Sequence, residues 1–237
     1  MKKELIEKSE WTKIREKLNK NYKYDDTWKE AINLFEKRLK HTFFDPIQLV
    51  IDNKRRKGEG FTIVSVQCAL IEMLSAFRQG KNFNHKMQRN SQNYEYKKSE
   101  EMFTCLLLEA PIFQDIFWQL DTKNQRKINQ PYNASDFYKN VRCGLMHEGR
   151  TKRNWHIDTE PNGILVKSEK RFIVTKNEKK IIYRTVLHYR LLEYLDGYYN
   201  ELRQDSQDGE KLRKYFARKL DHLFEFDPDP KYDWWTE

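Results

Sequence analysis

The sequence predicts a mainly α-helical protein with a small antiparallel β-sheet. Long segments carry apolar residues every three or four positions, which is the pattern of amphipathic helices. Only eight glycines and six prolines occur in 237 residues, too few for a many-turned β-sandwich. Short β-branched and aromatic runs are confined to about residues 154–184 and indicate the sheet. The length fits one domain or a domain with a small appendage and cannot choose between them. We expect residues 1–237 to form a single domain with its own core.

The first 45 residues predict an N-terminal helical extension. Residues 2–20 have apolar residues at helical spacing on a charged segment. Asp25, Asp26 or Thr27 can cap a second helix, whose apolar stripe ends or bends at Pro46.

Residues 61–78 predict the central helix of a bundle, because they are apolar nearly all round. Glu72 is the only acidic residue in this helix. A buried carboxylate must be paired or hydrogen-bonded. We therefore expect Glu72 to meet an arginine or backbone donors, or else to lie at the edge of the bundle.

The rest of the chain predicts further helices around the small sheet. The polar residues 79–98 indicate a functional or mobile loop. Ser99 and Ser135 are expected to cap helices, and Pro111 to begin a short helix through Trp118. The sheet has two to four strands, including one at 163–167. Two helices follow at about 185–203 and 209–225, and the tryptophan-rich tail packs on the body or on a partner.

Charge and cysteine usage indicate the compartment and the class of partner. The chain has 45 basic and 36 acidic residues and a net charge of +9, which attracts polyanions such as RNA but is also compatible with plain solubility. Cys68, Cys105 and Cys143 form no C-x-x-C pair, as is usual in a reducing compartment. No apolar run approaches 18 residues and the N-terminus lacks a secretory signal. We expect a cytoplasmic protein without a membrane partner.

The stretch "FYKNVRCGLMHEGRTK" contains an arginine and a histidine separated by four residues, Arg142 and His147. The composition gives roughly 0.4 such pairs by chance, so the spacing alone is not specific. Five residues of helix advance about 500°, which leaves the two side chains about 140° apart and about 7.5 Å apart along the axis. Both can reach one phosphate, but one chain supplies only half a site. Two copies around a symmetry axis would complete it.

This stretch, together with the preceding "SVQCALIEMLSAFRQGK", resembles the HEPN superfamily over residues 61–150. The resemblance implies an up-and-down helical bundle as the core, with the sheet at 154–184 as an insertion and 185–237 as C-terminal helices and tail. It also implies metal-independent RNA cleavage, with Arg142 and His147 as the catalytic residues and no cofactor. A homodimer through the motif helices, a toxin or antiviral role and a neutralising protein partner are further implications. Active members commonly carry Asn, Asp or His after the arginine, where this chain has Cys143. The alternative is therefore a catalytically inactive HEPN-like scaffold for RNA binding or dimerisation.

The residue types suit RNA cleavage. A neutral imidazole can take the proton of a ribose 2′-OH. The 2′-oxygen then attacks phosphorus while a guanidinium stabilises the added charge. The products are a 2′,3′-cyclic phosphate and a free 5′-OH, and DNA should resist because it lacks the 2′-OH.

Further residues are candidates for supporting roles. Gly144 would let a phosphate approach the backbone. The remaining supporting candidates are Tyr138, Cys143, Glu148 and Glu72. Lys54, Arg55, Arg56 and Lys57 form a phosphate-binding rim or a solvated loop. Arg150, Lys152 and Arg153 bind a second phosphate or form a solvated helix end.

One further group of residues predicts a different kind of site, and the remaining histidines are expected to have no catalytic role. Asp158 with Glu178, Lys179 and Lys180 mimics the D…E-x-K arrangement of a metal-dependent nuclease, although Glu178 falls in a predicted turn. His85 and His156 are expected at the surface, and His188 and His222 at the edge of the core.

Overall fold

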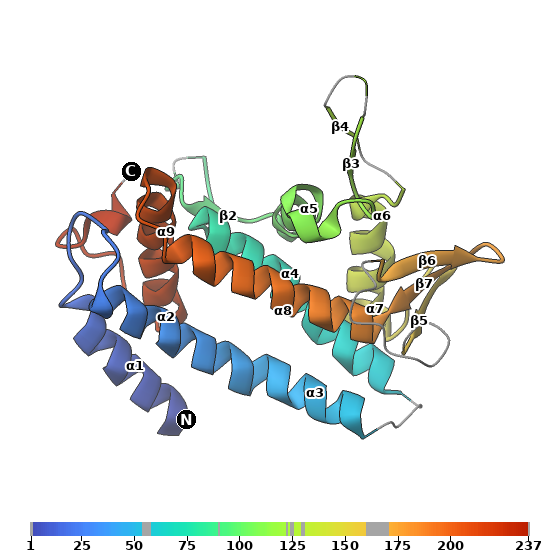
Figure 1. Ribbon diagram of the computed structural model, residues 1–237, viewed down its shortest axis with the longest axis horizontal. Helices are drawn as coiled ribbons and strands as arrows, with labels where there is room; N and C mark the ends of the chain where they lie inside the picture. Colours follow the sequence, from blue (N-terminus) through green and yellow to red (C-terminus); the bar gives the residue numbers. More distant parts are fainter. Residues whose placement is uncertain are drawn as a thin grey trace. The chain divides into compact units, whose positions relative to one another are not determined.

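A computed structural model of the chain describes residues 2–53, 58–89, 91–121, 123, 126–128, 131–159 and 171–236, the side chains of residues 2–5 excepted. The predicted cationic rim at Lys54, Arg55, Arg56 and Lys57 and the predicted strand at 163–167 lie outside these residues. The fold is mainly helical with small sheets, as the sequence predicts (Figure 1).

The helical segments include two π-helical turns, at Lys40–Phe44 and Tyr138–Arg142, and two short 3₁₀ turns, at Pro111–Phe113 and Asp233–Trp235. The α-helices are α1 (Lys2–Arg15), α2 (Asp26–Leu39), α3 (Asp45–Asp52), α4 (Glu59–Gln79), α5 (Ser99–Glu109), α6 (Ala134–Phe137), α7 (Cys143–Glu148), α8 (Arg184–Leu202) and α9 (Gln207–Leu223). The strands are β1 (Asn82–Phe83), β2 (Glu95–Tyr96), β3 (Gln119–Leu120), β4 (Lys127–Ile128), β5 (Trp155–Asp158), β6 (Ile173–Lys176) and β7 (Lys179–Tyr183).

The chain divides into two compact units, each built from separate stretches of sequence. Unit 1 contains residues 1–42, 76–97 and 196–237, and unit 2 contains residues 43–75 and 98–195. Helices α4 and α8 contribute residues to both units. The boundaries of these two units do not coincide with those of the segments expected from the sequence, which are the N-terminal extension, the bundle core, the β insertion and the C-terminal helices.

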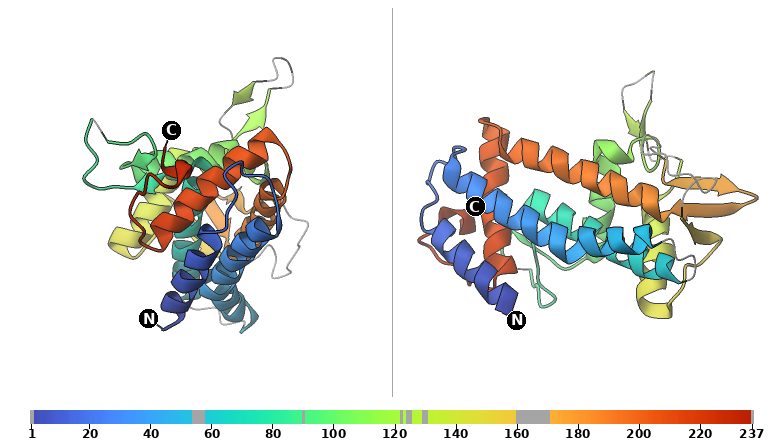
Figure 2. Two further views of the ribbon diagram at one scale, coloured as in Figure 1. Left: turned by 90° about the vertical axis from the view of Figure 1, so that its left-hand side faces the viewer. Right: turned by 60° about the horizontal axis from the view of Figure 1, so that its bottom comes forward.

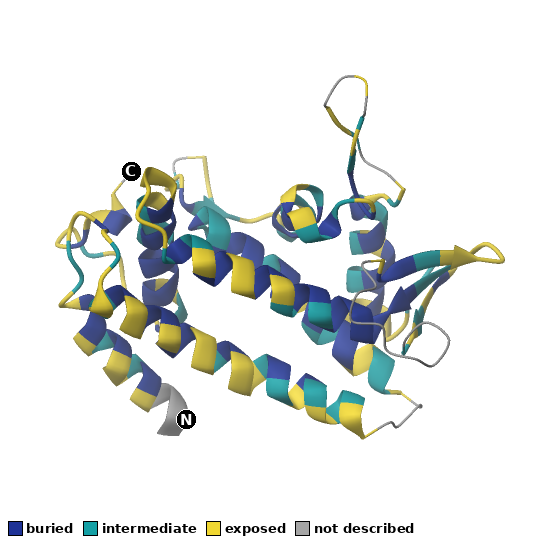
Figure 3. Ribbon diagram, in the orientation of Figure 1, coloured by how far each residue is buried: buried dark blue, intermediate teal, exposed yellow. Residues whose placement is uncertain are grey.

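Helix α2 carries the core of unit 1. Asp25 is its N-cap, as the sequence allows, and accepts a hydrogen bond from the Trp28 amide at 3.0 Å. The predicted apolar stripe is buried, and the opposite side of the helix is exposed (Figure 3). Phe35 of this stripe contacts Phe77 and Phe216, with ring centroids 4.3 and 5.3 Å away. The stripe therefore joins α2 to the end of α4 and to α9.

Helix α1 lies alongside α2 (Figure 2). It ends at Arg15, so the predicted helix over residues 2–20 is too long. The Asn19 side chain donates to the Lys23 carbonyl and to Asp25 at 3.0 and 2.7 Å. These bonds stabilise a turn before α2, and such local bonds compete with the helix.

A buried carboxylate, Asp221 of α9, ties the tryptophan-rich tail to α1. Within the described chain its donors are Trp11 Nε1 (2.8 Å), Arg15 Nη2 (2.8 Å), Trp234 Nε1 (2.8 Å) and Trp235 Nε1 (3.0 Å). The tail thus packs on the body, which is the first of the two expected arrangements. A carboxylate with this many donors satisfies the requirement that a buried charge be paired.

Two further arginines are fully buried in unit 1 and bind the ends of helices. Arg213 donates to the carbonyls of Leu202 and Gln204 at the end of α8. Arg218 donates to the Gly80 carbonyl, directly after α4, at 3.1 Å. The last carbonyls of a helix lack intrahelical partners and carry partial negative charge, so each guanidinium stabilises a helix end.

The polar stretch 79–98 is anchored in unit 1, although its composition predicts a mobile loop. Residues of β1 and β2 pair in parallel inside it. Tyr94 is buried against the Trp235 ring at 5.4 Å and beneath the Arg218 guanidinium at 4.7 Å. His85 is exposed, as expected.

Unit 2 contains most of α4 and an aromatic cluster. The helix is buried on the side formed by residues such as Val64, Cys68 and Ile71. The aromatic cluster comprises Phe103, Phe113, Phe117, Phe137 and Phe172. Within the described residues, α4 is the one helix long and apolar enough to cross a membrane, and more than half of that apolar stretch is buried inside the protein. Such burial is typical of the core helix of a soluble protein.

Three local predictions in unit 2 are wrong. Asn133, not Ser135, caps α6, and its side chain accepts the Asp136 amide at 2.9 Å. Ser99 lies inside α5, which begins after Lys98 without a side-chain cap. The helix expected from Pro111 to Trp118 is a 3₁₀ turn that ends at Phe113. Cap preferences rank residue types, but the local backbone decides which neighbour reaches the free amide.

The sheet of unit 2 is mixed, not antiparallel. Its order is β5-β7-β6, with β6 antiparallel and β5 parallel to β7. Asn177 and Glu178 join β6 to β7 with positive φ angles of 47° and 64°. Such a two-residue turn forces antiparallel pairing, whereas the longer connection between β5 and β6 imposes no direction. The hairpin of β3 and β4 was not predicted.

Candidate functional site

The motif lies on one helical segment of unit 2, formed by α6, the π turn Tyr138–Arg142 and α7. In this turn the Cys143 amide donates to the Tyr138 carbonyl, five residues earlier. A single π turn inside a helix is frequently found at functional sites. The turn occurs at Arg142 itself and sets the direction of this side chain.

The Arg142 guanidinium points to α4. Its Nη2 lies 3.4 Å from Oε2 of Glu72, and its central carbon lies 5.4 Å from the centroid of the Tyr138 ring. The side chains of Arg142 and Glu72 are 23% and 15% exposed. The partner arginine expected for a buried Glu72 is therefore Arg142, and the pair reaches the surface.

Electrostatics keep this guanidinium charged and the neighbouring phenol neutral. Burial acts to lower the pKa of Arg142, but Tyr138 and Glu72 outweigh it and leave that pKa above its usual value. Burial raises the pKa of Tyr138 to about 12, and a hydrogen bond with Cys143 adds to the increase. Tyr138 also contacts the edge of Phe103 at 5.3 Å. A neutral, packed phenol can hold the arginine in place without competing for its charge.

Two thiols border the ion pair. Cys143 follows Arg142, is partly exposed and hydrogen-bonds with it. Cys68 lies one turn before Glu72 on α4 and is buried, and this burial raises its pKa to about 12. A thiol is a weak hydrogen-bonding group, so Cys143 stabilises the guanidinium less than an Asn or Asp side chain would.

His147 lies on α7 and is exposed to solvent. Its surroundings differ from those of Arg142, which contacts α4. This agrees with the angular separation expected for five residues of helix. One chain thus offers the two functional groups on different sides of the same helix.

Gly144 has a structural role that differs from the expected one. A Cβ at this position would lie 2.5 Å from the Arg150 carbonyl oxygen, so a phosphate cannot approach the backbone there. The chain turns back at Gly149, whose φ is +67°, and the Arg150 amide donates to the Gly144 carbonyl at 3.3 Å. Gly144 leaves room for this return of the chain.

Replacing Gly144 with alanine is expected to lower the free energy of unfolding by about 1–3 kcal/mol, because the new methyl group meets a backbone oxygen that cannot move alone. Thermal unfolding followed by circular dichroism measures the change. Gly197→Ala is the matched control: this helical glycine has nothing within 4 Å of the added atom, so alanine should be neutral or stabilise by up to about 1 kcal/mol. Equal stability of the two variants would contradict the role assigned to Gly144.

The basic residues after the motif are partly neutralised. Glu148 forms an ion pair with Lys152 and a longer contact of 4.0 Å with Arg150. The bond with Lys152 lowers the pKa of Glu148. Arg150 and Arg153 are exposed, whereas Lys152 is anchored through its amide, which donates to the Asn140 carbonyl at 2.9 Å. Glu148 therefore orients these cations, and its neighbour His147 adds a smaller electrostatic contribution to the lowered pKa of Glu148.

The remaining histidines do not join the motif. His156 is exposed on β5 and His222 on α9. His188 is buried beside Phe44, with ring centroids 5.6 Å apart, and its burial lowers its pKa to about 4. A neutral, buried imidazole suits the structural role expected for it.

The residues of the metal-dependent alternative are separated in the structure. Glu178 lies in the turn between β6 and β7, as predicted, and Asp158 ends β5. No group of three or more His, Cys, Asp or Glu side chains in the described part of the chain is placed to hold a metal ion.

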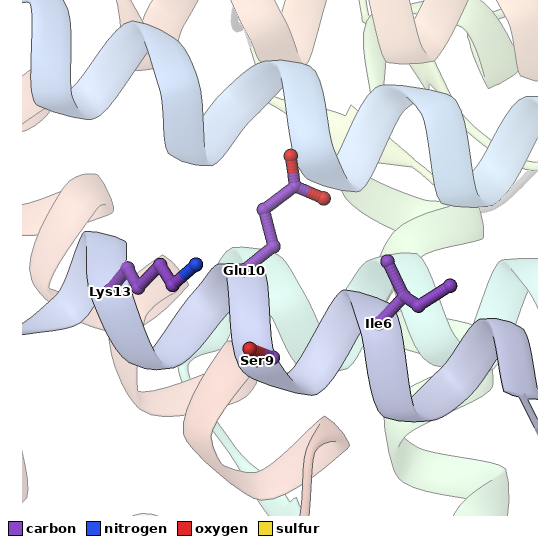
Figure 4. A pocket seen from close by; sticks show the side chains of 4 residues that line it. All are labelled: Ile6, Ser9, Glu10 and Lys13. Carbon is purple, nitrogen blue, oxygen red and sulfur yellow. The ribbon is translucent and has the colours of Figure 1, made fainter.

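A hollow of about 490 Å³ lies along α1 in unit 1. Ile6, Ser9, Glu10 and Lys13 line it from one helix (Figure 4). Ile6 and Glu10 extend from the same side of α1, and one acid, one base and one exposed apolar side chain make no catalytic pair. None of these lining residues belongs to the motif.

Sequence reasoning missed the contacts that fix the motif helix to the sheet. Asp136 accepts from Lys180 at 2.6 Å and from Trp155 Nε1 at 3.1 Å. Burial acts to raise the pKa of Asp136, but the bonds with Lys180 and Trp155 outweigh it and lower that pKa. Asn133 could have been found as an N-cap, three residues before Asp136. The π turn has no comparable sequence signal.

Comparison with protein-family models, with curated proteins and with solved structures finds no match to this chain.

Proposed function

We propose that the protein is a metal-independent endoribonuclease of the HEPN type. The observation that carries the proposal is the position of the Arg142 guanidinium. It lies at a π turn beside Glu72 and Tyr138 and is partly exposed. The exposed His147 lies on the same helical segment. The pair consists of a phosphate-binding group and a proton acceptor. These are the two functions that cleavage at a ribose 2′-OH requires.

Arg142 can bind a phosphate without leaving its place. A guanidinium carries five N–H donors in a fork that fits two phosphoryl oxygens. The contact with Glu72, at 3.4 Å, is longer than a strong N–H···O bond. A phosphate at normal hydrogen-bond distance would therefore compete well, and Glu72 would still orient the base of the side chain.

His147 acts as the general base. Its imidazole removes the proton from the 2′-OH, and the 2′-oxygen attacks the adjacent phosphorus. The bond to the 5′-oxygen breaks and this oxygen takes up a proton from water, which leaves a 2′,3′-cyclic phosphate on one product and a 5′-OH on the other. His147 releases the proton that it removed to solvent. Arg142 stabilises the charge on the phosphoryl oxygens.

The two groups lie on different sides of the helix, so a second copy of the chain completes the site. In a symmetric dimer through the motif helices, His147 of one copy would share a cleft with Arg142 of the other. Met146, beside His147, is 56% exposed and supplies an apolar contact for this interface. By its HEPN resemblance, such an enzyme would act on cytoplasmic RNA in a toxin or antiviral system and be restrained by a neutralising partner.

The test is cleavage of structured RNA by the purified full chain in EDTA, with analysis of the product ends. Cleavage that gives 2′,3′-cyclic phosphate and 5′-OH ends, and leaves DNA of the same sequence intact, is the expected result. Cleavage that requires an added divalent cation would contradict the proposal.

The second candidate is an RNA-binding or dimerising scaffold without catalysis. Cys143 favours it, because a weakly polar thiol occupies the position next to Arg142. In the same experiment, RNA that is bound but stays intact in EDTA and in Mg²⁺ would select the scaffold.

A further inference from the structure

The loop formed by residues 81–97 of unit 1 presents an aromatic pair to solvent. Phe83 of β1 and Tyr96 of β2 are partners in the parallel ladder. Their ring centroids lie 5.4 Å apart, and the two planes meet at 66°. Phe83 is 46% exposed, and Tyr96 is half-buried beside it. An exposed ring that is supported by a second ring offers a flat face to a further aromatic group.

Hydrogen bonds order this loop before any ligand arrives. The Asn84 amide donates to the Tyr96 carbonyl at 2.8 Å and continues the pairing of the strands beyond Phe83. In the turn between the strands, the Gln88 amide donates to Oγ of Ser91 at 2.8 Å. A surface that is already ordered loses less conformational entropy when a ligand binds.

The same loop is strongly basic. Between residues 81 and 97 the chain has one acidic residue, Glu95, and four basic residues, which are Lys81, Lys86, Arg89 and Lys97. Asn90, the one residue of this loop outside the described part of the chain, carries no charge. Lys86, Arg89 and Lys97 are exposed. The loop therefore attracts a ligand with several negative charges.

The acidic residue does not oppose this attraction at the aromatic pair. Glu95 is half-buried and interacts electrostatically with His222 of α9. Successive side chains of a strand point to opposite faces, so the Glu95 carboxylate lies on the face away from Tyr96. The face that carries the two rings is open to an anionic ligand.

Rings and cations together favour an unpaired nucleic-acid strand as this ligand. Its phosphates match the cations, and its bases match the exposed ring of Phe83. In a duplex the bases stack on one another, so only unpaired bases can stack on a side chain. An anionic membrane surface would need a larger apolar face for insertion, whereas Phe83 is followed by the polar Asn84 and His85.

We propose that residues 81–97 form a second binding surface, on which single-stranded RNA stacks one base on Phe83. Lys86, Arg89 and Lys97 contact phosphates of the same strand. That the strand is RNA rests on the proposed function, but the binding of an unpaired strand does not. Every base has a flat face, so this contact tolerates any sequence. The enzyme thereby gains a contact with its substrate outside the motif.

The first test measures binding of a labelled, unstructured dodecanucleotide RNA to the full chain by fluorescence anisotropy. The His147→Ala variant is the background, so that no RNA is cut. Adding Phe83→Ala is expected to lower the affinity by about 10-fold, as loss of one stacked base does. Adding Phe61→Ala instead is the matched control, because Phe61 of α4 is also exposed, at 42%, and should leave the affinity unchanged. An affinity that Phe83→Ala does not lower would overturn the proposal.

Salt dependence tests the phosphate contacts. On a single strand each phosphate contact contributes about 0.7 to the slope of log affinity against log salt concentration. The double variant Lys86→Gln with Arg89→Gln should therefore lower this slope by about 1.4. Lys29→Gln with Lys37→Gln is the matched control, since it removes the same charge from two exposed lysines of α2 in the same unit. Equal slopes for the two double variants would contradict phosphate binding by the loop.

Further oligomers identify what is bound. An abasic strand of the same length keeps the phosphates but cannot stack, so it should bind about 10-fold more weakly, and Phe83→Ala should not weaken it further. Duplex RNA that binds as tightly as the single strand would overturn the stacking contact. Single-stranded DNA should bind within about 3-fold of RNA, and a preference of about 10-fold for DNA would overturn the RNA assignment. RNA binding that depends on Phe83, in a chain that cuts no RNA in EDTA, would support this surface and contradict the nuclease alone.

Discussion

Replacing His147 with alanine is expected to lower the rate of RNA cleavage at least about 100-fold without unfolding the chain. General bases contribute about 10²- to 10⁴-fold to such reactions. The side chain is exposed on α7, so its removal leaves no cavity in the core. Single-turnover cleavage of an end-labelled RNA in EDTA measures the rate, and circular dichroism monitors the fold.

His156→Ala provides the matched control, because His156 is also exposed, in the same unit, on β5. This variant should cleave RNA at the rate of the unchanged chain. If both alanine variants cleave equally well, His147 is not the base. If His147→Ala binds RNA as tightly as before and fails to cut it, the loss belongs to the chemical step.

Replacing Asp221 with alanine is expected to lower the free energy of unfolding by about 3–5 kcal/mol, the largest stability effect predicted for this chain. The change leaves the buried Arg15 charge without its carboxylate, and removal of one partner of a buried ion pair has a cost of this size. It also removes the acceptor of three indole N–H groups, Trp11, Trp234 and Trp235. Urea unfolding followed by tryptophan fluorescence measures the change.

Asp227→Ala is the control for this experiment, because Asp227 is an exposed aspartate shortly after α9. Its replacement should change the unfolding free energy by less than about 0.5 kcal/mol. Asp221→Asn keeps the shape but gives up the charge, and should fall between the two. An unchanged urea midpoint for Asp221→Ala would show that the tail is not held by this carboxylate.

Much of the helical framework could be predicted from the sequence, because burial imposes a period on the chain. The stripe of α2, its Asp25 cap, the apolar α4 and the positions of α8 and α9 all follow from spacing and composition. The direction of β5 could not be predicted, since a period of two says nothing about which strand a segment joins. The N-terminal cap positions of α6 and α5, which are Asn133 and Lys98, depend on backbone angles that composition does not specify.

The candidate site was predictable in its residues but not in its geometry. The rule that a buried carboxylate needs a partner anticipated an arginine for Glu72, and the structure supplies Arg142. The π turn at Arg142 is a backbone feature that apolar spacing along the helix does not predict. Gly144 was assigned to phosphate approach because the chain reversal at Gly149, which fills that space, depends on contacts beyond the motif.

Unit 1 is assembled from three stretches that lie far apart in the chain, and its Asp221 cluster joins residues 11 and 235. During translation at about 5–20 residues per second, Trp235 follows Trp11 by roughly 10 to 45 s. For that time Trp11 and Arg15 of α1 lack the Asp221 cluster, and contacts between residues so far apart in the chain form slowly. Packing of this unit should therefore be completed only after Trp235 has been made.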